Sequence, residues 1–177
     1  MQQLVMRWFN DGKDDVDLII PNGVEIKNWK DIEDPLDKWL DIVQYGLTGT
    51  KQDEKYYKEC NYRYEYYKPE DCYFITYQGK EVATITVICD PIKKDGYVHM
   101  VAAKPEARGK GIGNLMALLA VKILKENNME TAHLTTDDFR IPAIKTYLNG
   151  GFCADVSTED FKTRWEKIYE ILGLKKA

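Results

Sequence analysis

Three alternate glycines stand where a strand-like run of residues gives way to a helix-like one. Residues 101–113 read Val-Ala-Ala-Lys-Pro-Glu-Ala-Arg-Gly-Lys-Gly-Ile-Gly, so that Gly109, Gly111 and Gly113 lie between the two segments. Because glycine has no Cβ, the backbone can turn tightly there and present successive N–H groups to a bulky anion. The free donors and the dipole of the following helix add to this attraction. The segment is therefore a candidate pyrophosphate-binding turn.

Two other phosphate-binding loops do not fit the same residues. The Walker loop requires serine or threonine after Gly-Lys, whereas Gly109-Lys110 is followed by Gly111. The dinucleotide-binding fingerprint requires a third glycine where Asn114 stands. Nucleoside triphosphates and Rossmann-type cofactors are therefore disfavoured as ligands.

Size and composition narrow the function classes further. The chain has 177 residues, 44% of them hydrophobic, which predicts a single domain over residues 1–177 with one sizeable core. Its 25 basic and 29 acidic side chains give a formal charge of -4, so no overall field attracts nucleic acid. Four cysteines stand singly, without the spacing of a metal site or a disulfide framework. No run approaches the roughly 20 apolar residues of a membrane span, so we expect a soluble cytoplasmic protein without metal, nucleic acid or membrane partners.

Hydrophobic periodicity predicts the elements that must position the glycine turn. A hairpin is expected around Gln78-Gly79-Lys80, because runs of β-branched and aromatic residues flank it. An antiparallel hairpin among alternating strands and helices predicts an α/β (α+β mixed) fold. The predicted strands cover residues 3–8, 72–77, 82–89, 97–103 and 131–136, and the predicted helices cover 31–47, 142–148, 157–172 and a segment from 112 to the pair 127–128.

The last predicted helix has its own start signal and an apolar face. Ser157 and Asp160 have the spacing of a capping box, which satisfies free backbone N–H groups at a helix start. Four apolar side chains recur at helical spacing along the same segment. The side chains expected on the buried face are Phe161, Trp165, Ile168 and Leu172.

Three motifs in order resemble those of one known family. Arg108, Gly111 and Gly113 fill Arg-x-x-Gly-x-Gly, which resembles the coenzyme A signature of the GCN5-related N-acetyltransferase (GNAT) superfamily. The strand that ends at Ala103-Lys104-Pro105 is similar to the family's fourth strand, and 131–136 stands where its fifth should be. Ala143-x-x-x-Tyr147-x-x-x-Gly151-Phe152 is similar to its tyrosine-bearing helix. The resemblance covers about residues 72–152, and residues 1–71 agree only in coarse order.

This resemblance implies a fold, a donor and a reaction. The fold would be a central mixed, mostly antiparallel sheet with flanking helices, here with an extra C-terminal helix. The chain would be an N-acyltransferase that uses acetyl-CoA, whose thioester a primary amine of a small molecule or peptide attacks in a ternary complex. The backbone of residues 100–103 would pair with the pantetheine arm, and the glycine turn would hold the pyrophosphate. The residues expected to bind the cofactor are Met100, Val101, Ala102, Ala103, Arg108, Gly109, Lys110, Gly111, Ile112, Gly113 and Asn114.

The resemblance also implies which residues take part in catalysis. Tyr147 would be the general acid that protonates the leaving thiolate, since a phenol can serve as such a donor. The N–H of Val101 or Ala102 would polarise the thioester oxygen. The general base is left open by the sequence, with His99 and Glu81 as candidates.

The sequence departs from the family pattern in two places. Arg140 stands where the family often has an asparagine that reaches toward pantetheine. After Phe152 only residues 153–156 precede another helix, whereas the family commonly continues with one or two strands. The C-terminal helix is therefore expected either to cover the edge of a shortened sheet or to pair with another subunit in a homodimer.

Several features leave alternatives open. The tyrosine-rich segment 51–68 would either line an acceptor pocket or simply pack, and Asp137 and Asp138 would either attract a cationic amine or remain solvated. A non-catalytic acyl-CoA sensor or partner-binding module is the alternative to an enzyme, and the small side chains of Val101, Ala102 and Ala103 also allow an acyl donor other than acetyl-CoA.

Overall fold

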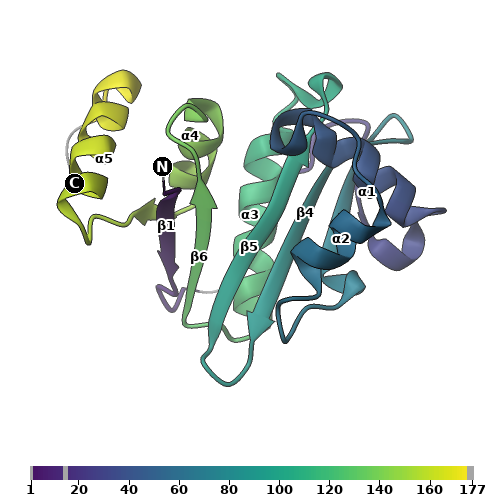
Figure 1. The fold of residues 1–177 in the computed structure, drawn as a ribbon, viewed down its shortest axis with the longest axis horizontal. Coiled ribbons are helices and arrows are strands. Elements are labelled where there is room, and N and C mark those ends of the chain that lie inside the picture. Colours follow the sequence, from purple (N-terminus) through teal and green to yellow (C-terminus); the bar gives the residue numbers. More distant parts are fainter. Residues whose placement is uncertain (1, 14–15, 175–177) are drawn as a thin grey trace.

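The computed structural model, which describes residues 2–13 and 16–174, contains one seven-stranded sheet in the order β2-β3-β4-β5-β6-β1-β7 (Figure 1). The strands are β1 Leu4–Phe9, β2 Val24–Asn28, β3 Cys72–Tyr77, β4 Lys80–Asp90, β5 Asp95–Ala103, β6 Thr131–Thr136 and β7 Cys153–Ala154. The α-helices are α1 Pro35–Val43, α2 Glu54–Asn61, α3 Ile112–Glu126, α4 Ile141–Asn149 and α5 Glu159–Leu172, and short 3-10 turns cover Trp29–Asp31, Pro69–Asp71 and Pro105–Ala107.

The sheet is antiparallel at every paired edge except one. β5 and β6 run parallel and pair only at Asp95–Thr131, Gly96–Ala132 and Tyr97–His133. Beyond those three pairs the strands separate, and Figure 1 shows them close at one end and apart at the other. The prediction of a mixed, mostly antiparallel sheet with flanking helices is therefore confirmed.

Helices cover both faces of the sheet and give two apolar layers. On one face, α3 buries most of its side chains against Ile85, Val87 and Val98. On the other face, α1 and α2 bury Trp39 and Tyr57 against Phe74 and a neighbouring cluster of apolar side chains. Because α1 and α3 contact β4 from opposite faces, the middle of the sheet is covered on both sides, and α1 also contacts β5.

Most predicted elements near the glycine turn are confirmed to within about two residues at either end. The helix that begins at Ile112 and the strand over 131–136 lie where the sequence placed them, and the predicted hairpin is β3 and β4. The predicted helix over 31–47 is wrong in extent, because Asp34 takes a left-handed conformation and the chain kinks at Tyr45 and Gly46. Strand β2 was not predicted at all.

The C-terminal segment differs from its prediction at its start. Thr158, rather than Ser157, caps α5, and its hydroxyl accepts a hydrogen bond of 3.1 Å from the N–H of Phe161. The predicted capping box of Ser157 and Asp160 is therefore wrong, although Phe161, Trp165 and Ile168 are buried as expected. The two-residue strand β7 pairs with β1 and ends the sheet, and α5 packs beside it (Figure 1).

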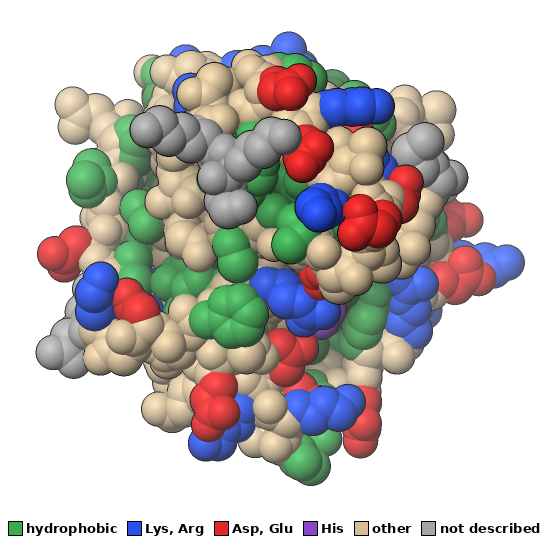
Figure 2. All heavy atoms as spheres, turned by 90° about the vertical axis from the view of Figure 1, so that its left-hand side faces the viewer, with side chains coloured by type: hydrophobic (Ala, Val, Ile, Leu, Met, Phe, Trp, Pro, Cys, Tyr) green, Lys and Arg blue, Asp and Glu red, His purple; other side chains and the backbone are tan. Residues whose placement is uncertain are grey.

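The outer side of this end of the molecule is chemically mixed. Figure 2 shows hydrophobic side chains there in small groups between acidic and basic ones. Ile171 of α5 and Val156 before it are exposed. Pairing of this side with a second subunit stays a prediction.

Gly96 allows β5 to lie against α3 at the closed end of the parallel pair. A Cβ there would overlap Cδ2 of the fully buried Leu124 and would lie 3.3 Å from Cβ of Ala132. We therefore expect Gly96→Ala to lower the free energy of unfolding by about 1–3 kcal/mol, measured by urea denaturation, because the site is overpacked. In a Leu124→Ala background the same substitution should cost much less. An equal cost in both backgrounds would exclude the clash as the cause.

Candidate active site

The glycine turn connects β5 to α3 and takes a conformation that side chains other than glycine rarely adopt. Gly109 and Gly111 have φ angles of +70° and +74°. Gly111 is the N-cap of α3, no side chain accepts a hydrogen bond at this cap, and the first helical bond runs from Leu115 to Gly111. The N–H groups of residues 112–114 lie ahead of that bond. They form, with the helix dipole, a site suited to an anion.

The two basic side chains of the turn have different surroundings. Arg108 is exposed after the 3-10 turn at Pro105–Ala107. The ammonium of Lys110 lies 4.6 Å from the ring centroid of Tyr77 at the end of β3. Both residues shortly precede the N-cap Gly111 in the chain, and their part in a phosphate site stays a prediction.

A bulge interrupts β5 next to the point where β6 diverges. Thr84 pairs with Ala102 but Thr86 pairs with His99, so Met100 and Val101 together face one residue of β4. Met100 has a φ of +49°, which is uncommon for a residue with a side chain. Residues 98–103 have no partner in β6. The predicted pantetheine-binding residues therefore lie on a strand edge that the sheet leaves unpaired.

The separation of the two strands opens a cleft of about 480 Å³. Its walls come from β5, β6, the beginning of α4 and the region of α2. The residues that line it are Gln3, Leu47, Tyr56, Glu59, Cys60, Arg63, Tyr97, Val98, His99, Met100, Val101, Leu134, Thr135, Thr136, Arg140, Ala143 and Tyr147. Met100, Val101 and Tyr147, which the sequence proposed for three separate tasks, thus share one cavity.

Tyr147 reaches the cleft from α4, which packs tightly on α3. A Cβ on Gly150 would lie 2.9 Å from Cβ of Ala117, so only a residue without a side chain allows this approach. The Tyr147 side chain is 8% exposed and its ring meets that of Phe152 edge-on, with centroids 6.0 Å apart. Burial raises the pKa of the phenol well above its ordinary value. Tyr147 therefore keeps its proton at neutral pH.

The two candidate general bases differ in their position relative to the cleft. His99 lines the cleft, and its Nε2 lies 3.2 Å from the carbonyl oxygen of Cys60. Burial lowers the pKa of His99 to about 4, so the imidazole is neutral at physiological pH. Glu81 does not line the cleft and instead forms an ion pair of 3.4 Å with Lys38. Of the two, only His99 is positioned to meet a substrate there.

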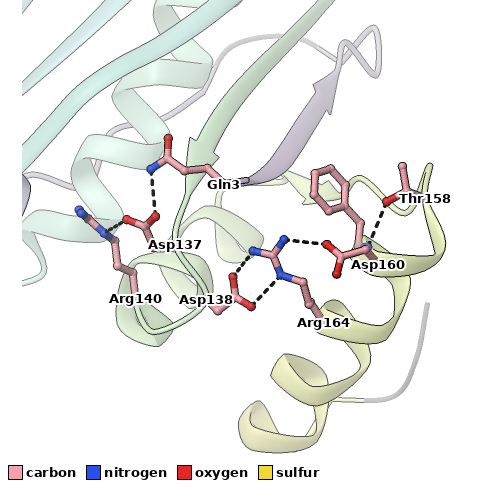
Figure 3. A network of polar contacts seen from close by, with 8 residues as sticks. Gln3, Asp137, Asp138, Arg140, Thr158, Asp160 and Arg164 are labelled. Atoms are coloured by element: carbon pink, nitrogen blue, oxygen red, sulfur yellow. Dashed lines mark hydrogen bonds and ion pairs between the residues drawn. The ribbon is translucent and has the colours of Figure 1, made fainter. Parts of the chain in front are cut away.

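The aspartates after β6 are occupied by arginines (Figure 3). Asp137 accepts hydrogen bonds from Nε of Arg140 at 2.9 Å and from the amide of Gln3 at 3.1 Å. Asp138 is held by two nitrogens of Arg164 on α5, which also contacts Asp160 at 2.9 Å. Neither aspartate lines the cleft. Their pairs with arginines connect the β6–α4 loop to Arg140 and to α5, and a contact with a cationic amine stays untested.

The tyrosine-rich segment packs partly in the core and lines the cleft with another part. Tyr57 and Tyr67 are buried, with their hydroxyl oxygens 2.6 Å apart. Tyr57 stacks on Trp29 at 5.3 Å and meets Trp39 edge-on at 5.1 Å. Tyr56, on the neighbouring position of α2, instead lines the cleft. Part of the segment is therefore core and part is wall.

The cleft contains two charged side chains that the sequence reasoning did not single out. Glu59 and Arg63 are one helical turn apart, on and just after α2. Their sequence surroundings are rich in both charge signs, so nothing in the pattern distinguished them from solvated residues. Only the packing of α2 beside β5 brings them to the cavity.

Within residues 2–13 and 16–174, no three His, Cys, Asp or Glu side chains converge as metal ligands would. In the same part of the chain, every helix is too short or too polar to cross a membrane.

Comparison with known proteins points to one family. Residues 36–152 match the model described as the Acetyltransferase (GNAT) family. Mycothiol acetyltransferase of Tsukamurella paurometabola is 31% identical over 67 residues, which cover 38% of this chain and 23% of that protein. The match thus spans about a quarter of that curated relative.

Solved structures show the same fold at low sequence identity. A GCN5-related N-acetyltransferase from Sphaerobacter thermophilus has a TM-score of 0.66 and 15% identity, over 88% of this chain and 50% of that one. The ribosomal-protein-S18-alanine N-acetyltransferase of Escherichia coli has a TM-score of 0.59 and 19% identity, over 73% and 77% of the two chains. A Bacillus subtilis acetyltransferase in complex with CoA has a TM-score of 0.55 and 18% identity, over 73% and 76%.

The link between α5 and the cleft can be tested through Arg164. Arg164→Met should lower the free energy of unfolding at pH 7 by about 1–2 kcal/mol, since it removes charged hydrogen bonds but keeps the aliphatic stem. Arg164 holds the pKa of Asp138 below its ordinary value, so this contribution is present above about pH 4 and is lost as the pH falls further. Denaturant unfolding at pH 7 and pH 3 measures both effects.

The matched control for Arg164→Met lies on the same helix. Lys162→Met removes an exposed cation whose ion pair with Glu159 is 3.9 Å long, and should change stability by less than about 0.5 kcal/mol. Equal losses for the two variants, or a loss for Arg164→Met that does not shrink at low pH, would contradict the role given to the Arg164–Asp138 pair.

Proposed function

Because the chain belongs to the Acetyltransferase (GNAT) family, we propose that it transfers an acetyl group from acetyl-CoA to a primary amine of a small molecule or peptide. One observation supports this most strongly. The glycine turn, the unpaired edge of β5 and the cleft with Tyr147 follow one another along β5, in the order in which the diphosphate, pantetheine arm and thioester of acetyl-CoA follow one another. A single extended cofactor would use all three.

The chain offers acetyl-CoA mostly backbone contacts. The N–H groups at the start of α3 would donate hydrogen bonds to the diphosphate, with Arg108 and Lys110 adding positive charge. The free edge of β5 would pair with the amide groups of the pantetheine arm, as an added strand does. This mode of binding depends on backbone shape, which explains why glycines rather than reactive side chains mark the site.

The bulge in β5 supplies a candidate donor for the thioester oxygen. The N–H of Lys104 bonds to the carbonyl of Val82 on β4, and N–H groups alternate in direction along a strand. Ala102 pairs with Thr84 on β4 and lies two residues before Lys104. Its N–H therefore points toward β4, like that of Lys104. We therefore assign the oxyanion contact to Val101, the other residue considered from the sequence.

The proposed reaction is a direct transfer. The neutral amine attacks the carbonyl carbon, the new C–N bond forms, the C–S bond breaks and the thiolate of CoA leaves. Tyr147 donates its proton to that thiolate and recovers a proton from solvent, and its burial keeps the phenol protonated beforehand. The pKa of about 4 makes His99 a weak base. Glu59, the carboxylate among the cleft-lining residues, is the better candidate to take the amine's proton through water.

Cofactor binding can be tested separately from chemistry by changing Gly109. Gly109→Ala should weaken CoA binding by about tenfold or more in calorimetry, since a non-glycine residue at this φ shifts the N–H groups that receive the diphosphate. Gly79→Ala is the matched control, because Gly79 has a similar φ of +77° and equally open surroundings in the β3–β4 turn. Equal CoA affinity for both variants, or no uptake of CoA by the unaltered protein, would contradict the proposed cofactor site.

The chemical step is tested at Tyr147. Tyr147→Phe should lower the turnover number at least about 100-fold in a thiol-release assay, while CoA affinity stays nearly unchanged, because only proton donation is lost. Tyr169→Phe is the control, since Tyr169 is equally buried but lies on α5 outside the cleft. Unchanged turnover in Tyr147→Phe would remove this residue from the acid role. Tight CoA binding without turnover over a broad amine panel would instead favour a non-catalytic sensor.

A further inference from the structure

Arg63 stands at the end of the cleft that lies away from the glycine turn. Arg63 lines the cleft together with Tyr97 and His99, and the ring of Tyr64, which its guanidinium contacts, packs against both of them. Tyr97 is the last residue of β5 that still pairs with β6, at His133. Arg63 therefore faces the closed end of the cleft, whereas the diphosphate of acetyl-CoA would lie at the open, glycine-turn end of β5.

Arg63 is an exposed residue at the rim of the cleft, and its guanidinium contacts one aromatic ring but no opposite charge within the residues described. It donates a hydrogen bond of 2.8 Å to the hydroxyl oxygen of Tyr64, and its central carbon lies 4.9 Å from the centroid of that ring. Tyr64 is in turn packed against Tyr97 and His99, with centroid distances of 5.2 Å and 5.1 Å. No carboxylate in the described part of the chain lies within 4.0 Å of Arg63. Most of its five N–H donors are thus free for a ligand.

The other arginines give a useful contrast. Three other arginines each form an ion pair with an aspartate. Arg7 lies 2.8 Å from Asp155, Arg140 lies 2.9 Å from Asp137, and Arg164 pairs with Asp138. Arg108, the other arginine without such a partner among the described residues, stands beside the proposed diphosphate site. The two arginines without an internal anion therefore flank opposite ends of the cleft region.

The remaining charges near Arg63 do not neutralise it. His99 is uncharged at neutral pH, and Glu59 has Lys55 as its ion-pair partner at 3.7 Å. Glu59 and Arg63 are four residues apart yet do not form an ion pair within 4.0 Å. A dicationic acceptor such as a polyamine would place a second positive charge in a cleft that already contains one without a counter-ion.

We propose that Arg63 binds a carboxylate of the acceptor, so that the substrate class is an amine that also carries a carboxylate. This inference rests on the proposed acetyl transfer, and it names the acceptor of that same site. A planar guanidinium with free donors matches a carboxylate in two parallel hydrogen bonds, and the adjoining Tyr64 limits its rotation. Phosphonates have related chemistry, so they form a separate arm of the test.

The test compares matched ligands that differ only in the anion. L-amino acids are compared with their carboxamides and with aminoalkylphosphonates, by calorimetry on CoA-saturated protein and by kcat/KM in thiol release. We expect the amino acids to be preferred over their amides by about tenfold or more. Arg63→Gln should abolish this preference because it weakens binding of the amino acids but not of their amides. Arg63→Lys should retain part of the preference. A preference for the phosphonates over the amino acids would overturn the carboxylate assignment.

Lys58→Gln provides the matched control. It removes one positive charge from the same helix, but Lys58 pairs with Glu54 and does not line the cleft. It should leave the preference for the carboxylate unchanged. Equal handling of acids and amides by the unaltered protein, or a preference that survives in Arg63→Gln, would overturn the inference.

A further titration distinguishes failure of the carboxylate site from failure of the proposed acetyl transfer. The amino acids are also titrated into protein without CoA, and binding there that Arg63→Gln abolishes would support the anion site even if acetyl-CoA were not bound. Uptake of CoA with no binding or turnover of any amino acid would overturn the acceptor class while leaving the cofactor site intact.

Discussion

The parallel contact between β5 and β6 lasts for only three residue pairs, and the candidate site depends on that brevity. A longer ladder would bury the backbone of residues 98–103 and leave no cleft. The bulge at Met100 and Val101 turns β5 at this point, and α4 packs on α3 through Gly150 and Ala117, where a larger side chain could not fit. The sheet therefore ends its pairing at a defined position. Its unmatched hydrogen-bonding groups are the feature that a bound pantetheine arm would satisfy.

The two faces of the sheet support different sides of this gap. On one face α3 begins at the glycine turn and is buried along most of its length, so the proposed diphosphate site rests on the largest apolar layer of the protein. On the other face the aromatic cluster of Trp29, Trp39 and Tyr57 supports α2, whose outer side faces the cleft. The proposed donor side thus rests on a buried helix, and side chains form the wall of the proposed acceptor side. Changes in the wall could alter the acceptor without disturbing α3.

Paired and unpaired charges are distributed in a way that fits this division. Arg164 joins α5 to the β6–α4 loop, and Asp137 orients Arg140 at the start of the helix that carries Tyr147 (Figure 3). Aspartates pair with both of these arginines, and Arg140 also lines the cleft. Arg63 and Arg108 have no such partner among the described residues; Arg63 lines the cleft, and Arg108 stands beside the proposed diphosphate site. A bound anion would supply the opposite charge that the protein itself does not place beside these two arginines.

The sequence by itself determined the glycine turn, helix α3, strand β6 and the position of Tyr147 on its helix, because glycine conformation and hydrophobic periodicity act over a few neighbouring residues. It also predicted the mixed sheet and the family resemblance. It erred over 31–47 and at the cap of α5, where the left-handed Asp34 and the choice of Thr158 over Ser157 depend on how the chain meets its neighbours. Only the tertiary structure placed His99 in the cleft and Glu81 outside it, paired Asp137 and Asp138 with arginines, and brought Glu59 and Arg63 to the cavity. These outcomes rest on contacts between residues far apart in the chain, whose geometry is set by packing and leaves no local pattern to recognise.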